Sequence, residues 1–205
     1  YNEPVVFYEF MLDCARLARS KSMKNVMVSN GFISKEPLEE IIEYIDAFNI
    51  DLKSFDQDFY KNQANARLAP VLESIGRIAD SGLHLELTFL VIPGLNDDAA
   101  KFKDMIRWIE DVCGEEQVLH LSRYFPHYKL MKSSTPLSTI KDLTEIARSK
   151  LKYVYPGNTG LSLDSSTYCH TCNALLIERS MYEVKNTMDG SKCPHCASEV
   201  PGVFK

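Results

Sequence analysis

The 205-residue sequence lacks several features that would assign it to a class at once. No apolar run reaches the roughly 18 residues that a membrane-spanning helix needs, and no charged segment followed by an apolar stretch marks a secretory signal. The net charge is -5 and there is no basic block, so we expect neither a nucleic-acid partner nor a membrane partner. The phosphate-binding Walker loop, the G-x-G-x-x-G dinucleotide fingerprint and the G-x-S-x-G elbow are also absent.

The composition is that of an ordinary globular protein, with 45% apolar and 25% charged residues. The length suits one medium domain with a small appendage. We therefore predict a cytoplasmic protein. The sequence begins at Tyr1 rather than Met, which leaves room for an upstream segment, so the missing signal carries little weight.

Four of the six cysteines lie near the C-terminus in two C-x-x-C pairs, Cys169 with Cys172 and Cys193 with Cys196. A C-x-x-C turn aims two thiolates at one ion, and two such turns supply four soft ligands that suit zinc or a single iron. Because four thiolates leave no open position for a substrate, we predict a structural zinc ribbon. Free or disulfide-bonded cysteines are the alternative, and the histidines inside the two turns are interpreted as surface residues.

Before the cysteines, strand-like and helix-like segments alternate along the sequence. The predicted strands cover residues 26–29, 48–52, 83–92, 118–124 and 153–155. The predicted helices cover residues 4–20, 34–45, 70–81, 97–113 and 137–150. Such alternation implies parallel strands in an open sheet or a barrel. Helical periodicity ends near residue 160, so we predict an α/β domain over residues 1–160 and the cysteine module over residues 161–205.

Polar side chains follow the ends of the predicted strands, where parallel α/β folds bind their ligands. Ser29 and Asn30 follow the first strand, and Asp51 and Lys53 follow the second with their side chains on the same side. Loops are polar in any case, so this pattern alone does not separate a site from ordinary surface. A lysine in this place could form a Schiff base with a carbonyl substrate or bind a carboxylate.

Four segments resemble, in order and spacing, successive motifs of radical S-adenosylmethionine (SAM) enzymes: residues 1–4 (YNEP), 26–31 (VMVSNG), 50–55 (IDLKSF) and 91–97 (VIPGLND). They most resemble those of the pyruvate formate-lyase-activating enzymes. Residues 123–130 (RYFPHYKL) and the terminal cysteine pairs are similar to the radical SAM member of the AmmeMemoRadiSam system. The resemblance implies a partial (β/α)6 barrel of parallel strands, truncated here and followed by the zinc ribbon.

The resemblance also implies which residues contact SAM: Glu3, Ser29, Asn30, Asp51, Lys53, Ile92 and His127. Glu3 would bind the amino group, and Ser29 and Asn30 would lie near the ribose and the methionine moiety. Lys53, in an Asp-Leu-Lys motif that includes Asp51, would reach the carboxylate. Ile92 would flank the adenine, and His127 would lie on the ribose side.

One family motif has no match in this sequence, the C-x3-C-x2-C segment that holds the [4Fe–4S] cluster. In the family this motif precedes the segment that residues 1–4 match. The resemblance therefore implies a fragment without the first two strands and the cluster loop, inactive by itself. Residues 26–29 would then form a sheet edge, with Phe7, Phe10 and Met11 of the adjoining helix partly uncovered. The chain would either associate with itself through this edge or cover it with the displaced N-terminal helix.

These observations leave three hypotheses for function. In the first, the whole enzyme cleaves SAM reductively with a [4Fe–4S] cluster, and the resulting 5′-deoxyadenosyl radical abstracts hydrogen from a protein glycine or a small-molecule substrate. In the second, Lys53 is the Schiff-base lysine of a lyase. In the third, the zinc ribbon binds a partner and the barrel is its scaffold.

Overall fold

The computed structural model describes residues 2–180 and 183–202, which form two sheets. The larger sheet has five parallel strands in sequence order, β1 (Val26–Ser29), β2 (Ala47–Asp51), β3 (His84–Val91), β4 (Val118–Arg123) and β5 (Tyr153–Gly157). Each strand falls at one of the predicted positions, and the prediction of a parallel α/β fold is confirmed.

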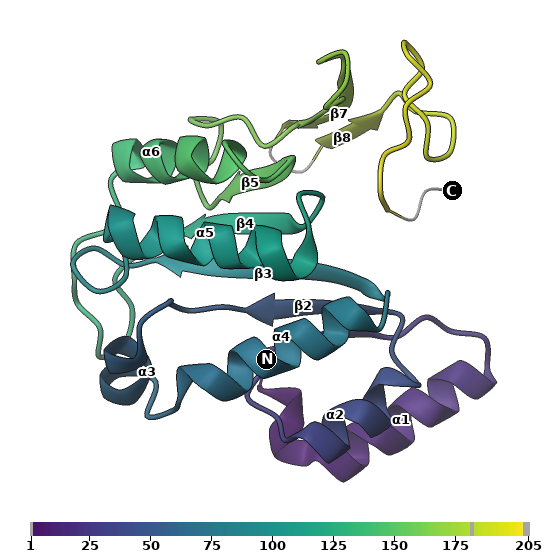
Figure 1. Ribbon diagram of the computed structural model, residues 1–205, viewed down its shortest axis with the longest axis vertical. Coiled ribbons are helices and arrows are strands. Elements are labelled where there is room, and N and C mark those ends of the chain that lie inside the picture. Colours follow the sequence, from purple (N-terminus) through teal and green to yellow (C-terminus); the bar gives the residue numbers. More distant parts are fainter. Residues whose placement is uncertain (1, 181–182, 203–205) are drawn as a thin grey trace.

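Helices connect these strands and pack on one face of the sheet, with α4 and α5 in front of the strands in Figure 1. They are the 3-10 helix η1 (Pro4–Phe7) and the α-helices α1 (Tyr8–Ser20), α2 (Lys35–Ile42), α3 (Gln57–Gln63), α4 (Leu68–Asp80), α5 (Ala99–Cys113) and α6 (Leu137–Arg148). None of the helices within residues 2–180 and 183–202 is both long and apolar enough to cross a bilayer.

Alternating side chains along β3 show which face of the sheet the helices cover. Leu87 and Phe89 are buried on the helical side, where the Phe89 ring packs against Phe102 of α5 with ring centres 5.4 Å apart. Glu86 and Thr88 point to the opposite side and are only half-buried. We call this second side the open face. A sheet with helices on one face and an open second face is the expected partial barrel.

The structure contains one helix that the apolar periodicity did not predict. α3 begins at Gln57 and is capped by Asp56, whose carboxylate accepts a hydrogen bond from the N–H of Asp58 at 2.8 Å. It buries Phe59 and Tyr60. Seven residues make too few turns for an apolar stripe to stand out from the sequence.

β1 forms one edge of the sheet, since it pairs with β2 alone in the described part of the chain. Beside it, 58% of Phe7 and 73% of Phe10 remain exposed, and Met11 is half-buried. The predictions that residues 26–29 lie at an edge and that these three side chains are partly uncovered are confirmed.

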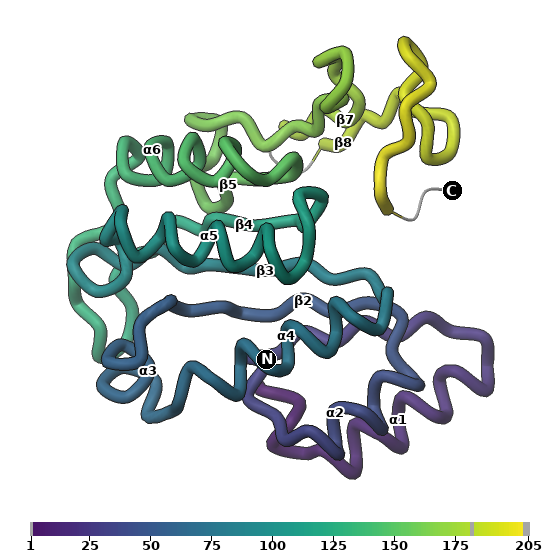
Figure 2. The backbone as a smooth tube through the Cα atoms, viewed as in Figure 1, coloured from purple at the N-terminus to yellow at the C-terminus, as the bar shows by residue number. Residues whose placement is uncertain are grey.

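The C-terminal module is an antiparallel sheet of β6 (Thr167–Tyr168), β7 (Leu175–Ser180) and β8 (Glu183–Asn186). β7 and β8 lie near β5 in both backbone views (Figures 1 and 2). The core of the module includes a barrel residue, because Tyr153 at the start of β5 packs with Cys169 and Leu176. The predicted boundary near residue 160 falls in the segment between β5 and β6.

Candidate functional site

The carboxylate of Glu3 binds the carboxyl end of β1. Its Oε1 accepts a hydrogen bond from the Ser29 hydroxyl at 2.7 Å, and its Oε2 accepts one from the backbone N–H of Asn30 at 2.7 Å. The Ser29 oxygen in turn accepts from the N–H of Gly31 at 3.1 Å. Three of the predicted SAM residues are therefore joined by direct hydrogen bonds.

Gly31 completes the turn after β1 for a steric reason. Its φ is +70°, and a Cβ at this position would come within 2.8 Å of the Ile50 side chain in β2. A larger residue would therefore displace the turn that presents Asn30. The glycine that follows Ser29 and Asn30 in the sequence is thus part of the geometry of the site.

Asp51 and Lys53 extend from the end of β2 on the same side, as their spacing predicts. Lys53 Nζ donates a hydrogen bond to Asp51 Oδ2 at 2.9 Å, with 41% and 33% of the two side chains exposed. A pair this exposed is weak, so the ammonium can turn to another carboxylate at little cost. The Tyr60 hydroxyl accepts a hydrogen bond from the backbone N–H of Lys53 at 3.1 Å, and burial raises the pKa of Tyr60 to about 12.

Asn96 is a buried positioning residue that follows a predicted strand and was not among the predicted SAM contacts. Its side-chain amide donates to the carbonyls of Lys53 at 2.7 Å and Leu90 at 2.8 Å, and its Oδ1 accepts from the N–H of Ile92 at 2.7 Å. It thereby ties the segment after β2 to the end of β3. The available sequence signal is an asparagine in a Pro-Gly turn, where asparagine often bonds nearby backbone.

A cavity of about 630 Å³ opens where the first three strands end. Asn30, Lys53 and Ile92 line it, together with Tyr60 and Lys129. It combines two ammonium groups, an amide and an apolar wall in one space. The cavity therefore lies where parallel α/β folds commonly bind ligands.

The remaining predicted SAM residues divide into two groups. Glu3 and Asp51 do not line this cavity but are hydrogen-bonded to Asn30 and Lys53, which do, and Ser29 is hydrogen-bonded to Glu3. His127 is exposed and outside the lining, and its backbone forms two hydrogen bonds of 3.2 Å with that of Leu130. The structure thus brings six of the seven residues to one region and leaves the His127 side chain apart.

The four C-terminal cysteines converge on one point. Their Sγ atoms all lie within 4.8 Å of one another, with Cys169 and Cys196 3.6 Å apart and Cys172 and Cys193 3.7 Å apart. A tetrahedron with zinc–sulfur bonds of about 2.3 Å has edges of about 3.8 Å, so this donor set fits one tetrahedral ion. A four-iron cluster would require a wider spacing, because each thiolate then binds its own iron.

Both C-x-x-C pairs adopt the same backbone turn. The N–H of Asn173 donates to the carbonyl of Cys169 at 2.8 Å, and the N–H of Ala197 donates to that of Cys193 at 2.9 Å. Asn173 and Ala197 both have a φ of 59°. Asparagine tolerates this left-handed region, whereas alanine is strained in it. The second turn therefore forms despite a local cost in backbone strain. Matching turns on two separate segments indicate a shared metal centre.

Ser198 favours the thiolate forms at this centre. Its hydroxyl lies 3.2 Å from both Cys169 Sγ and Cys196 Sγ. Burial raises the pKa of Cys169, but hydrogen bonds from Ser198 and from the backbone N–H of Cys172 outweigh it and lower this pKa to about 5. The Ser198 hydroxyl also holds the pKa of Cys196 below its ordinary value. These contacts favour the thiolate, which is the metal-binding form, at Cys169 and Cys196. At Cys172 the backbone bond with Ala174 lowers the pKa, but burial and the bonds with the neighbouring cysteines outweigh it and raise this pKa to about 12.

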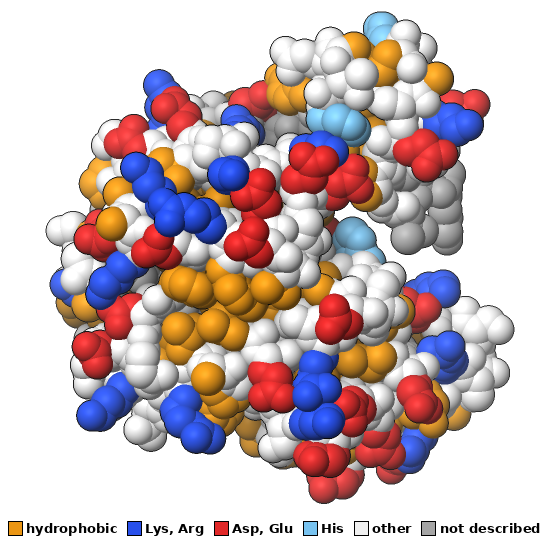
Figure 3. Space-filling model, in the orientation of Figure 1, with side chains coloured by type: hydrophobic (Ala, Val, Ile, Leu, Met, Phe, Trp, Pro, Cys, Tyr) orange, Lys and Arg blue, Asp and Glu red, His pale blue; other side chains and the backbone are white. Residues whose placement is uncertain are grey.

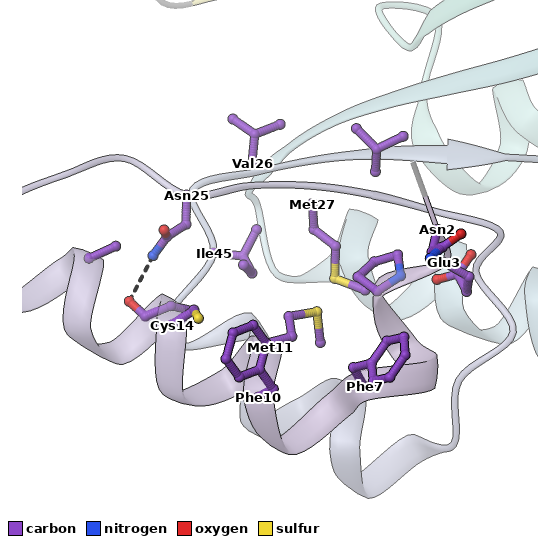
Figure 4. A pocket seen from close by; sticks show the side chains of 14 residues that line it. Asn2, Glu3, Phe7, Phe10, Met11, Cys14, Asn25, Val26, Met27 and Ile45 are labelled. Carbon is purple, nitrogen blue, oxygen red and sulfur yellow. Dashed lines mark hydrogen bonds between the residues drawn. The ribbon is translucent and has the colours of Figure 1, made fainter.

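A groove of about 730 Å³ runs between η1–α1 and the free edge of β1 (Figure 4). Phe7, Phe10 and Met11 line its helical side, and Val26 and Met27 line its strand side. The groove is mostly apolar. It places exposed aromatic side chains next to a strand edge whose outer backbone groups are unpaired in the described residues.

The part of the chain that holds six of the seven SAM candidates matches a known protein family. Residues 1–109 match the family model described as the radical SAM superfamily. This chain belongs to the radical SAM superfamily. The matched range includes the Glu3–Ser29 hydrogen bond, the Asp51–Lys53 pair and Asn96, so the connected cluster lies within the family domain.

The radical SAM chain also resembles curated proteins over most of its length. It is 40% identical over 205 residues to MJ0808 of Methanocaldococcus jannaschii, covering 98% of this chain and 61% of that protein. It is 22% identical over 133 residues to the pyruvate formate-lyase 1-activating enzyme of Escherichia coli strain K12, covering 64% of this chain and 52% of that enzyme. The chain therefore spans 61% and 52% of the lengths of these two relatives.

Solved structures show the same fold for the radical SAM chain. A domain of a pyruvate-formate lyase-activating enzyme from Bacteroides vulgatus superposes with a TM-score of 0.67 at 18% identity, covering 77% of this chain and 96% of that one. A radical SAM methyltransferase from Sphaerobacter thermophilus superposes with a TM-score of 0.60 at 13% identity, covering 80% and 50%. At these identities the likeness establishes the fold alone, and it confirms the radical SAM type of partial barrel.

The family implies SAM and an iron–sulfur cluster. The described residues fit SAM but offer no ligands suited to the cluster. The cavity at the strand ends offers an ammonium for a carboxylate and an apolar wall for an adenine, so its chemistry fits SAM. For the cluster, the described residues hold one group of three or more cysteines, the C-terminal centre, and its spacing suits a single ion. Cys14 and Cys113 are isolated thiols. No cluster ligands are therefore assigned in this radical SAM chain.

Proposed function

We propose that this chain is the SAM-binding part of an enzyme that uses SAM to start hydrogen abstraction. The enzyme would be of the type that activates glycyl-radical enzymes. The observation that carries the proposal is the cavity at the carboxyl ends of β1–β3, lined by Asn30, Lys53 and Ile92. The similarity to a pyruvate formate-lyase 1-activating enzyme supports the activating type. The substrate would be a protein glycine or a small molecule.

SAM carries a carboxylate, an ammonium, a sulfonium and an adenine, and the cavity offers a counterpart for several of them. The Lys53 ammonium would bind the carboxylate, and the buried side chain of Ile92 would flank the adenine. The Glu3 carboxylate lies outside the cavity lining but is bonded to the backbone of Asn30, which lines it, and would attract the amino group. Bound SAM supplies a 5′-deoxyadenosyl radical when an electron reaches its sulfonium, and the thiolates for the electron-donating cluster are not among the described residues.

The two other hypotheses gain less support. A Schiff-base role for Lys53 gains no support from its surroundings, since its Nζ donates a hydrogen bond to Asp51 Oδ2 at 2.9 Å as in an ordinary exposed ion pair. A ribbon that binds a partner requires surface beyond its metal centre, and the contact of Tyr153 with Cys169 and Leu176 supports a ribbon docked on its own barrel. Both are secondary to SAM binding.

The proposal is tested by titrating SAM into this chain by isothermal calorimetry. Lys53→Ala should weaken binding by about tenfold, because it removes the charge-assisted hydrogen bond to the SAM carboxylate. Lys141→Ala is the matched control, since Lys141 is an exposed lysine of α6 that lies 4.0 Å from Glu145. Equal SAM affinity in the two variants, or no SAM binding by the unmodified chain, would contradict the proposed site.

A further inference from the structure

A second cavity, of about 750 Å³, lies at the opposite end of the sheet from the SAM candidates. Its lining includes the first residue of every strand of the larger sheet, Val26, Ala47, His84, Val118 and Tyr153. The ribbon closes one side with Ile177, Arg179 and Val200. Figure 3 shows a hollow between the ribbon and the body of the protein, with a histidine at its edge.

Arg179 of β7 is held in the wall of this cavity with part of its guanidinium unused. Its Nη1 donates to Thr167 Oγ1 at 2.7 Å and to the Ser165 carbonyl at 3.2 Å. Its guanidinium carbon lies 5.1 Å from the centre of the Tyr155 ring. In the described part of the chain its Nε and Nη2 donate no hydrogen bond and no carboxylate lies within 4 Å of its charge. Arg179 is thus a half-buried, well-positioned cation without a counter-ion there.

Glu86 on the open face is already hydrogen-bonded to two histidines. His84 Nε2 lies 3.1 Å from Glu86 Oε1, and His120 Nε2 lies 2.8 Å from Glu86 Oε2. Because the carboxylate only accepts, each Nε2 carries its hydrogen in these bonds. These hydrogen bonds, that of His120 first, hold the pKa of Glu86 well below its usual range.

The other charged side chains of the cavity are paired with each other, and apolar side chains form much of its wall. Lys24, on the rim, pairs with Asp46 at 2.7 Å. The ring of His120 lies 5.7 Å from that of Tyr155 in a tilted arrangement, and Val118 and Ile177 form apolar wall between the strand ends and the ribbon. The cavity therefore pairs one available cation with a largely apolar interior.

We propose that this cavity is a binding site for an organic anion, with its carboxylate or phosphate on Arg179 and its apolar body between the strand ends and the ribbon. The site lies at the opposite end of the sheet from the SAM candidates and does not rest on the proposed function. Its ligand class is set by Arg179, since the guanidinium fork matches the geometry of carboxylate and phosphate oxygens.

The arrangement favours an anion over a cation or a neutral molecule for two reasons. The carboxylates in the wall, Glu86 and Asp46, are engaged by His84, His120 and Lys24, so they offer little to a cationic ligand. A half-buried cation with no counter-ion pays for lost hydration, and an anionic ligand offsets this cost. A neutral ligand of the same shape would leave Arg179 unpaired.

The proposal is tested by calorimetric titration of the metal-loaded chain with phenyl phosphate, benzoate and the neutral analogue benzyl alcohol. At least one anion should bind, and benzyl alcohol should bind at least tenfold more weakly. Binding of phenyl phosphate alone identifies a phosphate ligand, binding of benzoate alone a carboxylate, and binding of both the shared oxyanion chemistry. R179Q should weaken anion binding at least tenfold. R107Q is the matched control, because Arg107 is an exposed arginine that pairs with Asp104 at 3.1 Å.

A direct measurement on the unmodified chain covers the case in which R179Q disturbs the ribbon. The ring resonances of His84, His120 and Tyr155 should shift with the anions and stay in place with benzyl alcohol. R179K, which keeps the charge without the fork, should bind with intermediate affinity. The proposal is overturned if neither anion binds the unmodified chain, if R179Q binds as well as R107Q, or if the ring resonances respond equally to the neutral analogue.

Discussion

The hydroxyl of Ser29 donates a hydrogen bond of 2.7 Å to the carboxylate of Glu3, across 26 positions of sequence. The second oxygen of the same carboxylate accepts from the backbone of Asn30. η1 and the end of β1 are therefore joined by one side chain. The predicted contact of Glu3 with the SAM amino group would have to be made by the lone pairs that these bonds leave free.

Replacing Glu3 by alanine tests this joint. Glu3→Ala removes the acceptors of both bonds, those from the Ser29 hydroxyl and from the N–H of Asn30, and we expect a loss of about 1 to 2 kcal/mol in the free energy of unfolding. Urea denaturation measures it. Ser29→Ala, which keeps the backbone bond, should cost less. If both variants unfold at the urea concentration of the parent chain, the joint contributes nothing to stability.

The four-cysteine centre should bind close to one zinc or iron per chain, as measured by elemental analysis. With the metal bound, a thiol reagent should react quickly with the exposed Cys14. Burial raises the pKa of Cys113 to about 11, so that thiol should react slowly. Chelation should release the four ribbon thiolates to the reagent and unfold the ribbon.

The control for the metal centre is Cys14→Ser, which should keep full metal content, whereas Cys193→Ser should lose most of it. Chelation should also change the fluorescence of Tyr153, because this barrel residue packs against the ribbon core. A chain that folds normally through residue 202 and carries no metal would refute the metal centre.

The Glu86 cluster should give stability a specific pH dependence. The pKa of Glu86 is lowered from 4.5, so its contribution is present above about pH 4.5 and lost as the pH falls. The pKa of His84 is raised from 6.5 by the bond to Glu86, so its contribution is present below about pH 6.5 and lost as the pH rises. Both contributions are present between these limits.

Glu86→Gln should therefore lower the free energy of unfolding more at pH 5.5 than at pH 8.5. The difference between the two losses should be about 1 kcal/mol, because solvent screening weakens these partly exposed contacts. Thermal unfolding at the two pH values measures this difference. Glu145→Gln is the control, since Glu145 is an exposed carboxylate 4.0 Å from Lys141, and its effect should not depend on pH over this range. A pH-independent effect of Glu86→Gln would show that the titration of His84 is not coupled to Glu86.

The exposed edge of β1 should let the isolated chain associate with itself. Val26 is 65% exposed beside the groove of Phe7 and Phe10, and strand edges without a charge or proline pair readily. Sedimentation velocity should show a dimer whose share grows with concentration. Val26→Lys should weaken the dimer by about tenfold, because the charge would be buried in the new contact. Leu161→Lys, at a residue that is 70% exposed elsewhere, should leave it unchanged.

Much of the fold could be predicted from the sequence because its signals are local. The alternation along β3 and the 3.6-residue stripe of α5 are both visible in the order of residues, and both elements lie where they were expected. α3 was missed because it is too short to show a period. The closer resemblance to the AmmeMemoRadiSam group and the individual SAM roles remain predictions.

The candidate site could likewise be predicted only in part. Resemblance indicated Glu3, Asn30 and Lys53, but not that Asn96 would bond the Lys53 carbonyl from the end of the next strand. A buried asparagine looks the same in sequence as a solvated one. The difference lies in which carbonyls the fold brings within reach.

The sequence by itself determined two features of this protein: the paired cysteine turns, whose ligands lie within a few residues of each other, and the strand–helix alternation that produces a parallel sheet. Only the tertiary structure decided that Arg179 of the ribbon would face His84 and Glu86 at the start of the strands. The proximity of Arg179 to these strand residues depends on how the ribbon packs on Tyr153, which is a contact between distant segments of the sequence. The physical reason is that periodicity and turn chemistry act between neighbours, whereas packing brings together groups whose sequence separation carries no signal.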